Sequence, residues 1–261
     1  MITGIDHLVI AVPEPEAAAA ELEERIGLLA TSGGHHEGMG TINRIAWLAD
    51  GSYLELLGVE DREAALGWVV GAAAVESLDH GGGLACYALA TNELEATTAE
   101  LRANGSSIGQ VQHGSRLRPD GELVEWWSAA PQRIGLDAVP FLIQHAMTGV
   151  EWGPDGTAAR AEIRHPLGPR ALLSRLDLAA DDPPNTAALY FRELGLEFWA
   201  VGDLAVRDVG PHVIRLVRGA DMEVPAVITL GASVEAPRST NAFGLRFDVE
   251  PVAAVAVATR A

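Results

Sequence analysis

The opening of this chain recurs twice further along it. Gly4–Leu22 reads GIDHLVIAVPEPEAAAAEL and Gly83–Leu101 reads GLACYALATNELEATTAEL, with eight of nineteen paired positions identical. Ser174–Leu196, SRLDLAADDPPNTAALYFRELGL, matches Asp6–Leu28 and shares its Gly-Leu ending. Each copy reads as an apolar strand, a short break and an amphipathic helix. Since so small a unit cannot bury its own core, the copies are predicted to pack against one another.

The first unit continues with three more strands. Its apolar strand, Ile5–Val12, leads through two prolines into a helix that ends near Ile26, before Gly27. Further strands are predicted near Leu28–Thr31, Asn43–Ala49 and Ser52–Val59, the last two joined by an Asp-Gly hairpin turn. The unit therefore has the order β-α-β-β-β.

The later units repeat this order. The second runs from a strand at Leu84–Ala90 to a closing strand at Val139–His145. A strand is predicted near Ala158–Arg164 before the third unit, and a truncated fourth copy after it, ending in a helix over Pro251–Thr259. A Gly-rich stretch after the second unit suggests two domains. We predict a domain of residues 1–149, holding two modules, and a domain of residues 150–261 packed on it.

Charge and composition exclude several functions. The formal charge of −18 argues against nucleic acid or an anionic membrane as partner. All 18 basic residues are arginine, which excludes lysine Schiff-base chemistry and a phosphate-loop lysine. The single cysteine, Cys86, fits a reducing cytosol, and neither a signal peptide nor a bilayer-spanning apolar run is evident. We therefore expect a cytoplasmic protein whose partner is a small-molecule ligand.

Two stretches carry a family resemblance. The tandem unit that opens with GIDHLVIAV and closes with YLELLGV resembles the vicinal oxygen chelate superfamily, which includes glyoxalase I, bleomycin-resistance proteins and extradiol dioxygenases. His35–Val59 resembles the glyoxalase-like domain group more narrowly. The resemblance implies an α+β fold in which tandem βαβββ modules form a cupped half-barrel, here with a third module and a partial fourth. It also implies a homodimer.

The resemblance further implies a divalent metal, Zn, Ni, Mn or Fe, held in the cup by the first and last strand of each module. The matching residues are His7 and Glu55 in the first module. The second module departs from the pattern, with Cys86 and either Ile143 or Gln144 at these positions. The third carries Arg175 and Arg215, so we expect no metal there.

The residues themselves also single out Glu55. A carboxylate in the apolar strand YLELLGV needs a cation or strong donors, because an unpaired buried charge is costly. His7 is the natural partner, through a shared metal or through a direct hydrogen bond. We predict that both side chains point into one cup.

Five further residues are predicted to line that cup as a substrate-binding set. His36 and Asn43 flank a Gly-rich loop that we expect to act as a lid. Arg116 and Trp126 lie on the two arms of a hairpin, as an anion-binding group and an aromatic wall. His145 joins them if the register of the closing strand turns it inward.

Two functions follow. The first is a metal-dependent lyase, isomerase or dioxygenase acting on a small oxygenated metabolite, with Glu55 as ligand and catalytic base. The alternative is a non-catalytic binding or sequestration protein of the bleomycin-resistance type. The pair of His7 and Glu55 favours the first, and the incomplete second ligand set favours the alternative.

Overall fold

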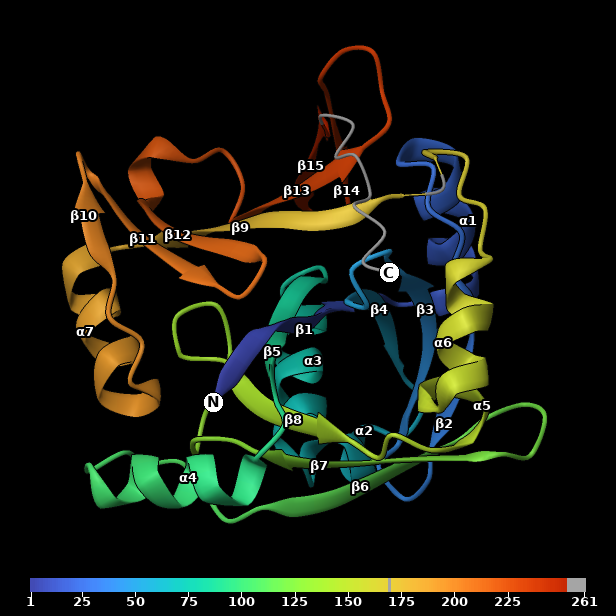
Figure 1. Ribbon diagram of the computed structural model, residues 1–261, viewed down its shortest axis with the longest axis horizontal. Coiled ribbons are helices and arrows are strands. Elements are labelled where there is room, and N and C mark those ends of the chain that lie inside the picture. Colours follow the sequence, from blue (N-terminus) through green and yellow to red (C-terminus); the bar gives the residue numbers. More distant parts are fainter. Residues whose placement is uncertain (169, 253–261) are drawn as a thin grey trace, which may run out of the picture.

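A computed structural model describes residues 1–168 and 170–252. The first two modules form one closed eight-stranded barrel in the order β1-β4-β3-β2-β6-β7-β8-β5 (Figure 1). The elements of the first module are β1 (Ile2–Ala11), α1 (Pro15–Arg25), β2 (Thr31–His36), β3 (Thr41–Trp47) and β4 (Tyr53–Val59). Those of the second are β5 (Gly83–Thr91), α4 (Leu94–Ala103), β6 (Gln112–Leu117), β7 (Leu123–Ala129) and β8 (Phe141–His145). The βαβββ order predicted from the repeats is thus present in both.

The two modules meet at two very different seams. Strands β1 and β5 pair antiparallel along eight residue pairs. Strands β2 and β6 meet at one pair only, His35 with Leu117, which closes the predicted cup into a barrel. A Cβ on Gly34 would lie 2.1 Å from the Leu117 carbonyl oxygen, so the close approach requires glycine there. The Gly-rich segment before His35, expected as a loop, is therefore largely strand β2.

The rest of the chain forms a seven-stranded sheet in the order β10-β11-β12-β9-β13-β15-β14. The third module comprises β9 (Leu172–Ala180), α7 (Pro183–Leu194), β10 (Trp199–Val201), β11 (Leu204–Val209) and β12 (His212–Arg218). A short 3-10 turn, η1 (Gly219–Asp221), follows it. The partial fourth module has β13 (Ala226–Ala232), β14 (Arg238–Ala242) and β15 (Leu245–Pro251). The helix predicted over Pro251–Thr259 falls mostly outside the described residues.

The pairing of the fourth copy repeats that of the others. Strand β13 pairs antiparallel with β9, as β5 does with β1, and parallel with β15, as β1 does with β4. Its strands β13 and β14 are joined by a short connection instead of a helix. The third module and a truncated fourth are therefore present, while the division into domains at residue 149 stays a prediction.

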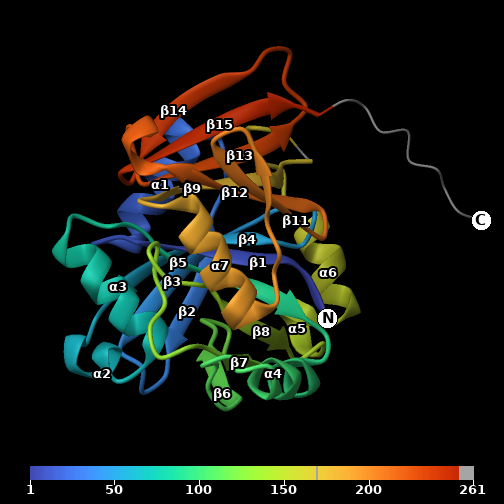
Figure 2. The ribbon, with the colours of Figure 1, turned by 90° about the vertical axis from the view of Figure 1, so that its left-hand side faces the viewer.

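The sheet lies across the outside of the barrel (Figure 2). Leu8 and Ile10 on the outer face of β1 share one apolar core with Leu176 of β9 and Phe247 of β15. Since the inner face of β1 is also buried, both faces of this strand need apolar residues, which explains its nearly continuous hydrophobic sequence. The opposite face of the sheet carries ion pairs on β9, β12 and β15.

This face carries the third-module arginines. Arg175 and Arg215 both donate to Asp177, through Nε–Oδ1 distances of 3.1 and 2.7 Å. Asp177 pairs with both guanidinium groups and Glu250 also accepts from Arg175, so the strand positions that carry His7 and Glu55 in the first module hold an ion cluster here.

Four helices lie between the modules. They are α2 (Arg62–Leu66), α3 (Val69–Asp79), α5 (Gly149–Trp152) and α6 (Pro154–Ala161). Helix α3 packs Val70 and Ala74 against Val9 and Ala11 on the inner face of β1. The strand predicted near Ala158–Arg164 is wrong, because α6 occupies the start of that segment and irregular backbone the rest.

Candidate functional site

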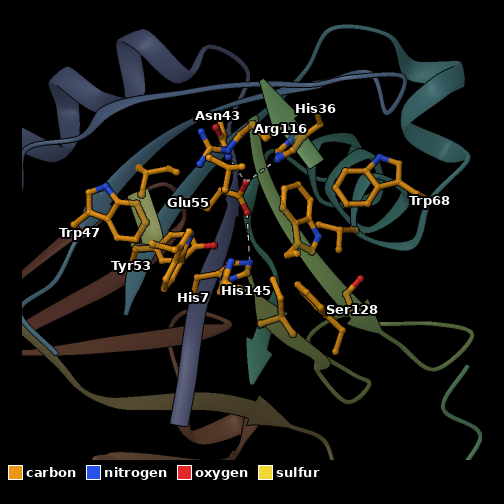
Figure 3. A pocket seen from close by; sticks show the side chains of 17 residues that line it. His7, His36, Asn43, Trp47, Tyr53, Glu55, Trp68, Arg116, Ser128 and His145 are labelled. Atoms are coloured by element: carbon orange, nitrogen blue, oxygen red, sulfur yellow. Dashed lines mark hydrogen bonds and ion pairs between the residues drawn. The ribbon is translucent and has the colours of Figure 1, made fainter. Parts of the chain in front are cut away.

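The interior of the barrel holds a small polar cavity surrounded by aromatic rings (Figure 3). Its volume is about 40 Å³, enough for about three water molecules at roughly 10–15 Å³ each. The aromatic lining residues are Trp47, Tyr53, Trp68, Trp126, Phe141 and Trp152. Polar groups in such a low-dielectric enclosure interact strongly, so their pairing defines the chemistry of the site.

At the centre of the cavity His7 faces Glu55. Strands β1 and β4 are parallel neighbours, with Val9 opposite Glu55, so both side chains lie on the inner face of the barrel. They are 3% and 5% exposed. The Nε2 atom of His7 lies 3.6 Å from Oε2 of Glu55. The ring of Tyr53 stacks on the imidazole at 4.5 Å between centroids and fixes its plane.

The second oxygen of Glu55 faces two other side chains. Asn43 donates from Nδ2 to Oε1 at 2.5 Å, and His36 places Nε2 at 3.7 Å from the same oxygen. The carboxylate therefore lies between two imidazoles and an amide, as the dashed lines in Figure 3 show. Of these three contacts, the one from Asn43 is a hydrogen bond, and the two imidazoles lie beyond hydrogen-bond distance, so the carboxylate keeps acceptor capacity inside the cavity.

The carboxylate of Asp6 contacts two of the imidazoles, those of His7 and His145. Its Oδ1 lies 2.7 Å from Nδ1 of His7 and 3.0 Å from Nε2 of His145. Burial alone would raise the pKa of Asp6, but the two imidazoles, His145 above all, outweigh burial and hold that pKa well below its usual range. Because an ionised carboxylate only accepts hydrogen bonds, Nδ1 of His7 carries a proton and Nε2 is turned toward Glu55.

Asp6 was not anticipated from the sequence. On a regular strand it would point away from His7, but the pairing of β1 with β5 shifts between Ile5 and His7. Such a bulge redirects a side chain, and it brings Asp6 to the two histidines. The available signal was a carboxylate beside a histidine in the otherwise apolar segment GIDHLVIAV.

His36 is held as a neutral imidazole. Its Nδ1 lies 2.8 Å from the Thr41 hydroxyl oxygen. Burial lowers the pKa of His36 to about 4; the charge of Glu55 opposes this shift and that of Arg116 reinforces it. At neutral pH the ring is uncharged and offers one donor and one acceptor nitrogen.

A buried ion pair joins the barrel to α5. Arg116 donates to the Gly33 carbonyl oxygen through Nη1 and to Oε2 of Glu151 through Nη2, at 2.6 Å for the latter. The next residue on α5, Trp152, stacks on His145 with 3.7 Å between ring centroids. The sequence prediction missed Glu151 and Trp152, because their segment was assigned to a domain boundary.

Residues 5–195 match the family described as Glyoxalase-like domain. The chain belongs to this family. It is accordingly a member of the vicinal oxygen chelate superfamily. No curated protein matches it.

Several solved structures are similar to this glyoxalase-like protein. A hypothetical protein from Staphylococcus aureus is 16% identical, with a TM-score of 0.78 over 95% of this chain and 99% of that one. Methylmalonyl-CoA epimerase from Streptomyces coelicolor, in complex with 2-nitronate-propionyl-CoA, is 20% identical over 55% of this chain and 97% of that one, with a TM-score of 0.41. A 4-hydroxymandelate synthase variant from Streptomyces coelicolor is 12% identical over 89% and 72%, with a TM-score of 0.49. The first of these shows that the whole four-module arrangement occurs elsewhere.

The second module of this glyoxalase-like protein does not supply metal ligands. Val9 pairs with Glu55, and its counterpart Ala88 pairs with Phe141, so Phe141 holds the position of Glu55. Neither Ile143 nor Gln144, the residues expected there, does so. The other position is Cys86, whose thiol has a pKa raised well above its usual value by burial. A four-ligand metal set does not fit these residues.

A three-ligand set is not assembled either. Within residues 1–168 and 170–252, no group of three or more His, Cys, Asp or Glu side chains has a geometry suited to a metal ion.

Among the helices in the same ranges, none has the length and hydrophobicity needed to cross a bilayer.

The structure brings all seven predicted site residues to one cavity. These are His7, His36, Asn43, Glu55, Arg116, Trp126 and His145. Trp126 meets His36 edge-on at 5.7 Å between centroids. The register of β8 turns Ile143 and His145 inward, while Gln144 points outward and accepts from the Leu94 backbone N–H. The roles assigned to these residues remain predictions.

Proposed function

We propose that this protein is an enzyme of the lyase or isomerase type that removes a proton from carbon beside a carbonyl group in a small oxygenated metabolite. Glu55 is the base. The observation that carries the proposal is the placement of its buried carboxylate between His7, His36 and Asn43 inside an aromatic cavity. A carboxylate with few competing waters and positioned hydrogen-bonding partners suits general-base chemistry.

The proposed step is a proton transfer. A Glu55 oxygen takes the proton from carbon, and the electron pair of the C–H bond moves onto the carbonyl oxygen as an enolate. Arg116, the nearest guanidinium on the cavity wall, and the amide of Asn43 supply donors for that oxygen. The proton then returns to a different carbon or face in an isomerisation. In a lyase reaction, collapse of the enolate instead expels a leaving group.

The imidazoles give the proton a path. His7 is fixed through Nδ1 by Asp6, and its Nε2 lies on the Glu55 side. His36, uncharged at neutral pH, lies on the other side of the same carboxylate. Either ring can exchange a proton with Glu55 through a short movement or one water molecule.

No step is routed through a metal. The predicted Zn, Ni, Mn or Fe ion retains two of its expected ligands, His7 and Glu55, and the second module offers only Cys86 and Phe141 in the matching places. We therefore assign the proton transfer to side chains. Metal analysis before and after chelation, with activity measured on both samples, tests this assignment.

A binding protein is the second candidate. The dense aromatic lining, with Phe141 at the position that corresponds to Glu55, favours sequestration of a planar ligand. This candidate predicts saturable binding without any proton exchange.

Deuterium incorporation into phenylpyruvate in D2O, followed by NMR, tests the proposal. The protein should accelerate exchange at the carbon beside the ketone, and Glu55→Gln should reduce the rate to background while the fold survives. Glu60→Gln is the matched control, since Glu60 is an exposed carboxylate at the end of the same strand segment. Saturable binding without exchange would leave the sequestration function, and exchange unchanged in Glu55→Gln would exclude Glu55 as base.

A further inference from the structure

The cavity is separated from a larger outer groove by one pair of stacked rings. Trp152 and His145 line both spaces, together with Ile143. The groove has a volume of about 440 Å³ and also reaches Asp6 and Met147. The stacked rings therefore form a partition, and moving the Trp152 ring joins the two spaces.

Such a movement is needed for any metabolite to bind. A cavity of about 40 Å³ is far below the size of sites that hold small organic ligands, roughly 300 Å³ or more. The ring of Trp152 occupies the end of the barrel beside Tyr53 and Trp47, with centroid distances of 6.3 and 5.6 Å. A bound ligand must take the space of this ring.

The same movement withdraws a negative charge. Glu151 precedes Trp152 on α5 and is 4% exposed, as is Arg116. Its Oε1 also lies 3.6 Å from Nη1 of Arg118. If Glu151 leaves, the Arg116 guanidinium keeps only the Gly33 carbonyl oxygen as a hydrogen-bond partner. A buried cation left in this way requires another anion.

Helix α6 places a third group, the guanidinium of Arg160, beside Trp152. The guanidinium of Arg160 lies over the rings of Trp47 and Trp152, 4.5 and 4.4 Å from their centroids. Its Nη1 is buried without a hydrogen-bond partner. The closed arrangement of this segment therefore has a cation with unused donor capacity above two aromatic rings.

On the proposed function's assignment of this cavity as the ligand site, we propose that the substrate is a small planar carboxylate. Its carboxylate takes the place of Glu151 on Arg116, and its ring or conjugated plane takes the place of Trp152 against His145. The Glu-Trp pair of α5 is an internal occupant of the site that the substrate displaces. Glu151 and Trp152 thus supply side by side the two groups that the ligand must combine, a carboxylate and a planar ring.

Benzoate binding by isothermal titration tests this proposal, with benzamide as the uncharged ligand of the same shape. Glu151→Gln removes the competing charge and keeps the size of the side chain. This variant should bind benzoate at least tenfold more tightly than the unchanged protein, and should bind benzamide no better. Glu162→Gln removes an exposed carboxylate just after α6 and should leave both affinities unchanged.

A second variant, Trp152→Ala, tests the proposal even if Glu151→Gln fails to fold. Trp152→Ala removes the ring and leaves the ion pair of Glu151 and Arg116 in place. Benzoate and benzamide should therefore both bind more tightly to this variant. The affinity for acetate, which has no ring, should not increase. Equal benzoate affinity in Glu151→Gln and the unchanged protein would overturn the proposal. So would equal gains for benzoate and benzamide in Glu151→Gln.

These outcomes are separable from those of the proposed function. Charge-dependent benzoate binding without any deuterium exchange would support the ligand class and reject the enzyme. Exchange into uncharged acetophenone as fast as into phenylpyruvate, and unaffected by Glu151→Gln, would support the enzyme and reject the ligand class.

Discussion

Substituting His36 by glutamine should reduce the loss of stability that the protein suffers in mild acid. Burial lowers the pKa of His36 from its ordinary 6.5 to about 4. Between these values the unfolded chain binds a proton at this residue and the folded protein does not, so acid favours unfolding. Going from pH 7 to pH 5, linkage gives a loss of about 2 kcal/mol from this one group.

Urea unfolding at pH 7 and pH 5 measures the effect. The free energy of unfolding of His36→Gln should fall about 2 kcal/mol less over this interval than that of the unchanged protein. His35→Gln is the control, because His35 is the exposed neighbour on the same strand, with 62% of its side chain accessible. The pKa of Asp6 lies far below this interval in the folded protein, and its ordinary value of 3.8 also lies below it, so Asp6 stays ionised in both states and contributes little. Equal losses in His36→Gln and the unchanged protein would refute the account of His36 as a buried neutral imidazole.

Two further substitutions test the core between the barrel and the second sheet and the packing at the site. Tyr87→Phe removes the 2.7 Å hydroxyl contact with Tyr190 and leaves that hydroxyl buried without a partner, so it should cost about 1–3 kcal/mol in urea unfolding; the double Phe variant should cost less than the sum of the single changes. Gly33→Ala would place a Cβ 1.8 Å from Oδ1 of Asn43 and push its amide away from the central carboxylate. Benzoate titration and the exchange assay should both show loss with the fold retained, whereas Gly219→Ala, whose Cβ would meet only atoms 3.9 Å away, should match the unchanged protein.

The module order and the central pair of His7 and Glu55 could both be predicted from the sequence. The repeats predict the module order because each copy keeps the periodicity of its strands and helix. The resemblance to the superfamily and the cost of an unpaired buried carboxylate together predicted that His7 and Glu55 lie side by side. What the sequence did not predict depends on backbone irregularity. The bulge at Asp6 and the close approach at Gly34 break the two-residue period on which strand predictions rely.

The register of the second module is a related case. The alignment of the closing-strand sequences FLIQHAM and YLELLGV predicted Ile143 or Gln144 as the counterpart of Glu55. The pairing of the strands gives Phe141 instead. A two-residue shift keeps the same face, so the hydrophobic pattern cannot detect it. The helices around Trp152 escaped prediction because they are short, and such helices are stabilised by the rings and charges they cover instead of by their own sequence.

The unequal seams of the barrel give the site one stiff side and one compliant side. His7 and Glu55 lie on β1 and β4, next to the long β1–β5 ladder and under the second sheet. His36 and Arg116 lie on β2 and β6, whose ladder consists of a single pair. The proposed base Glu55 and its partner His7 thus lie in the extensively paired part of the barrel, while His36 and Arg116 lie on two strands joined by a single residue pair. A barrel built from two similar modules can therefore open at the short β2–β6 seam while the long β1–β5 seam keeps its geometry.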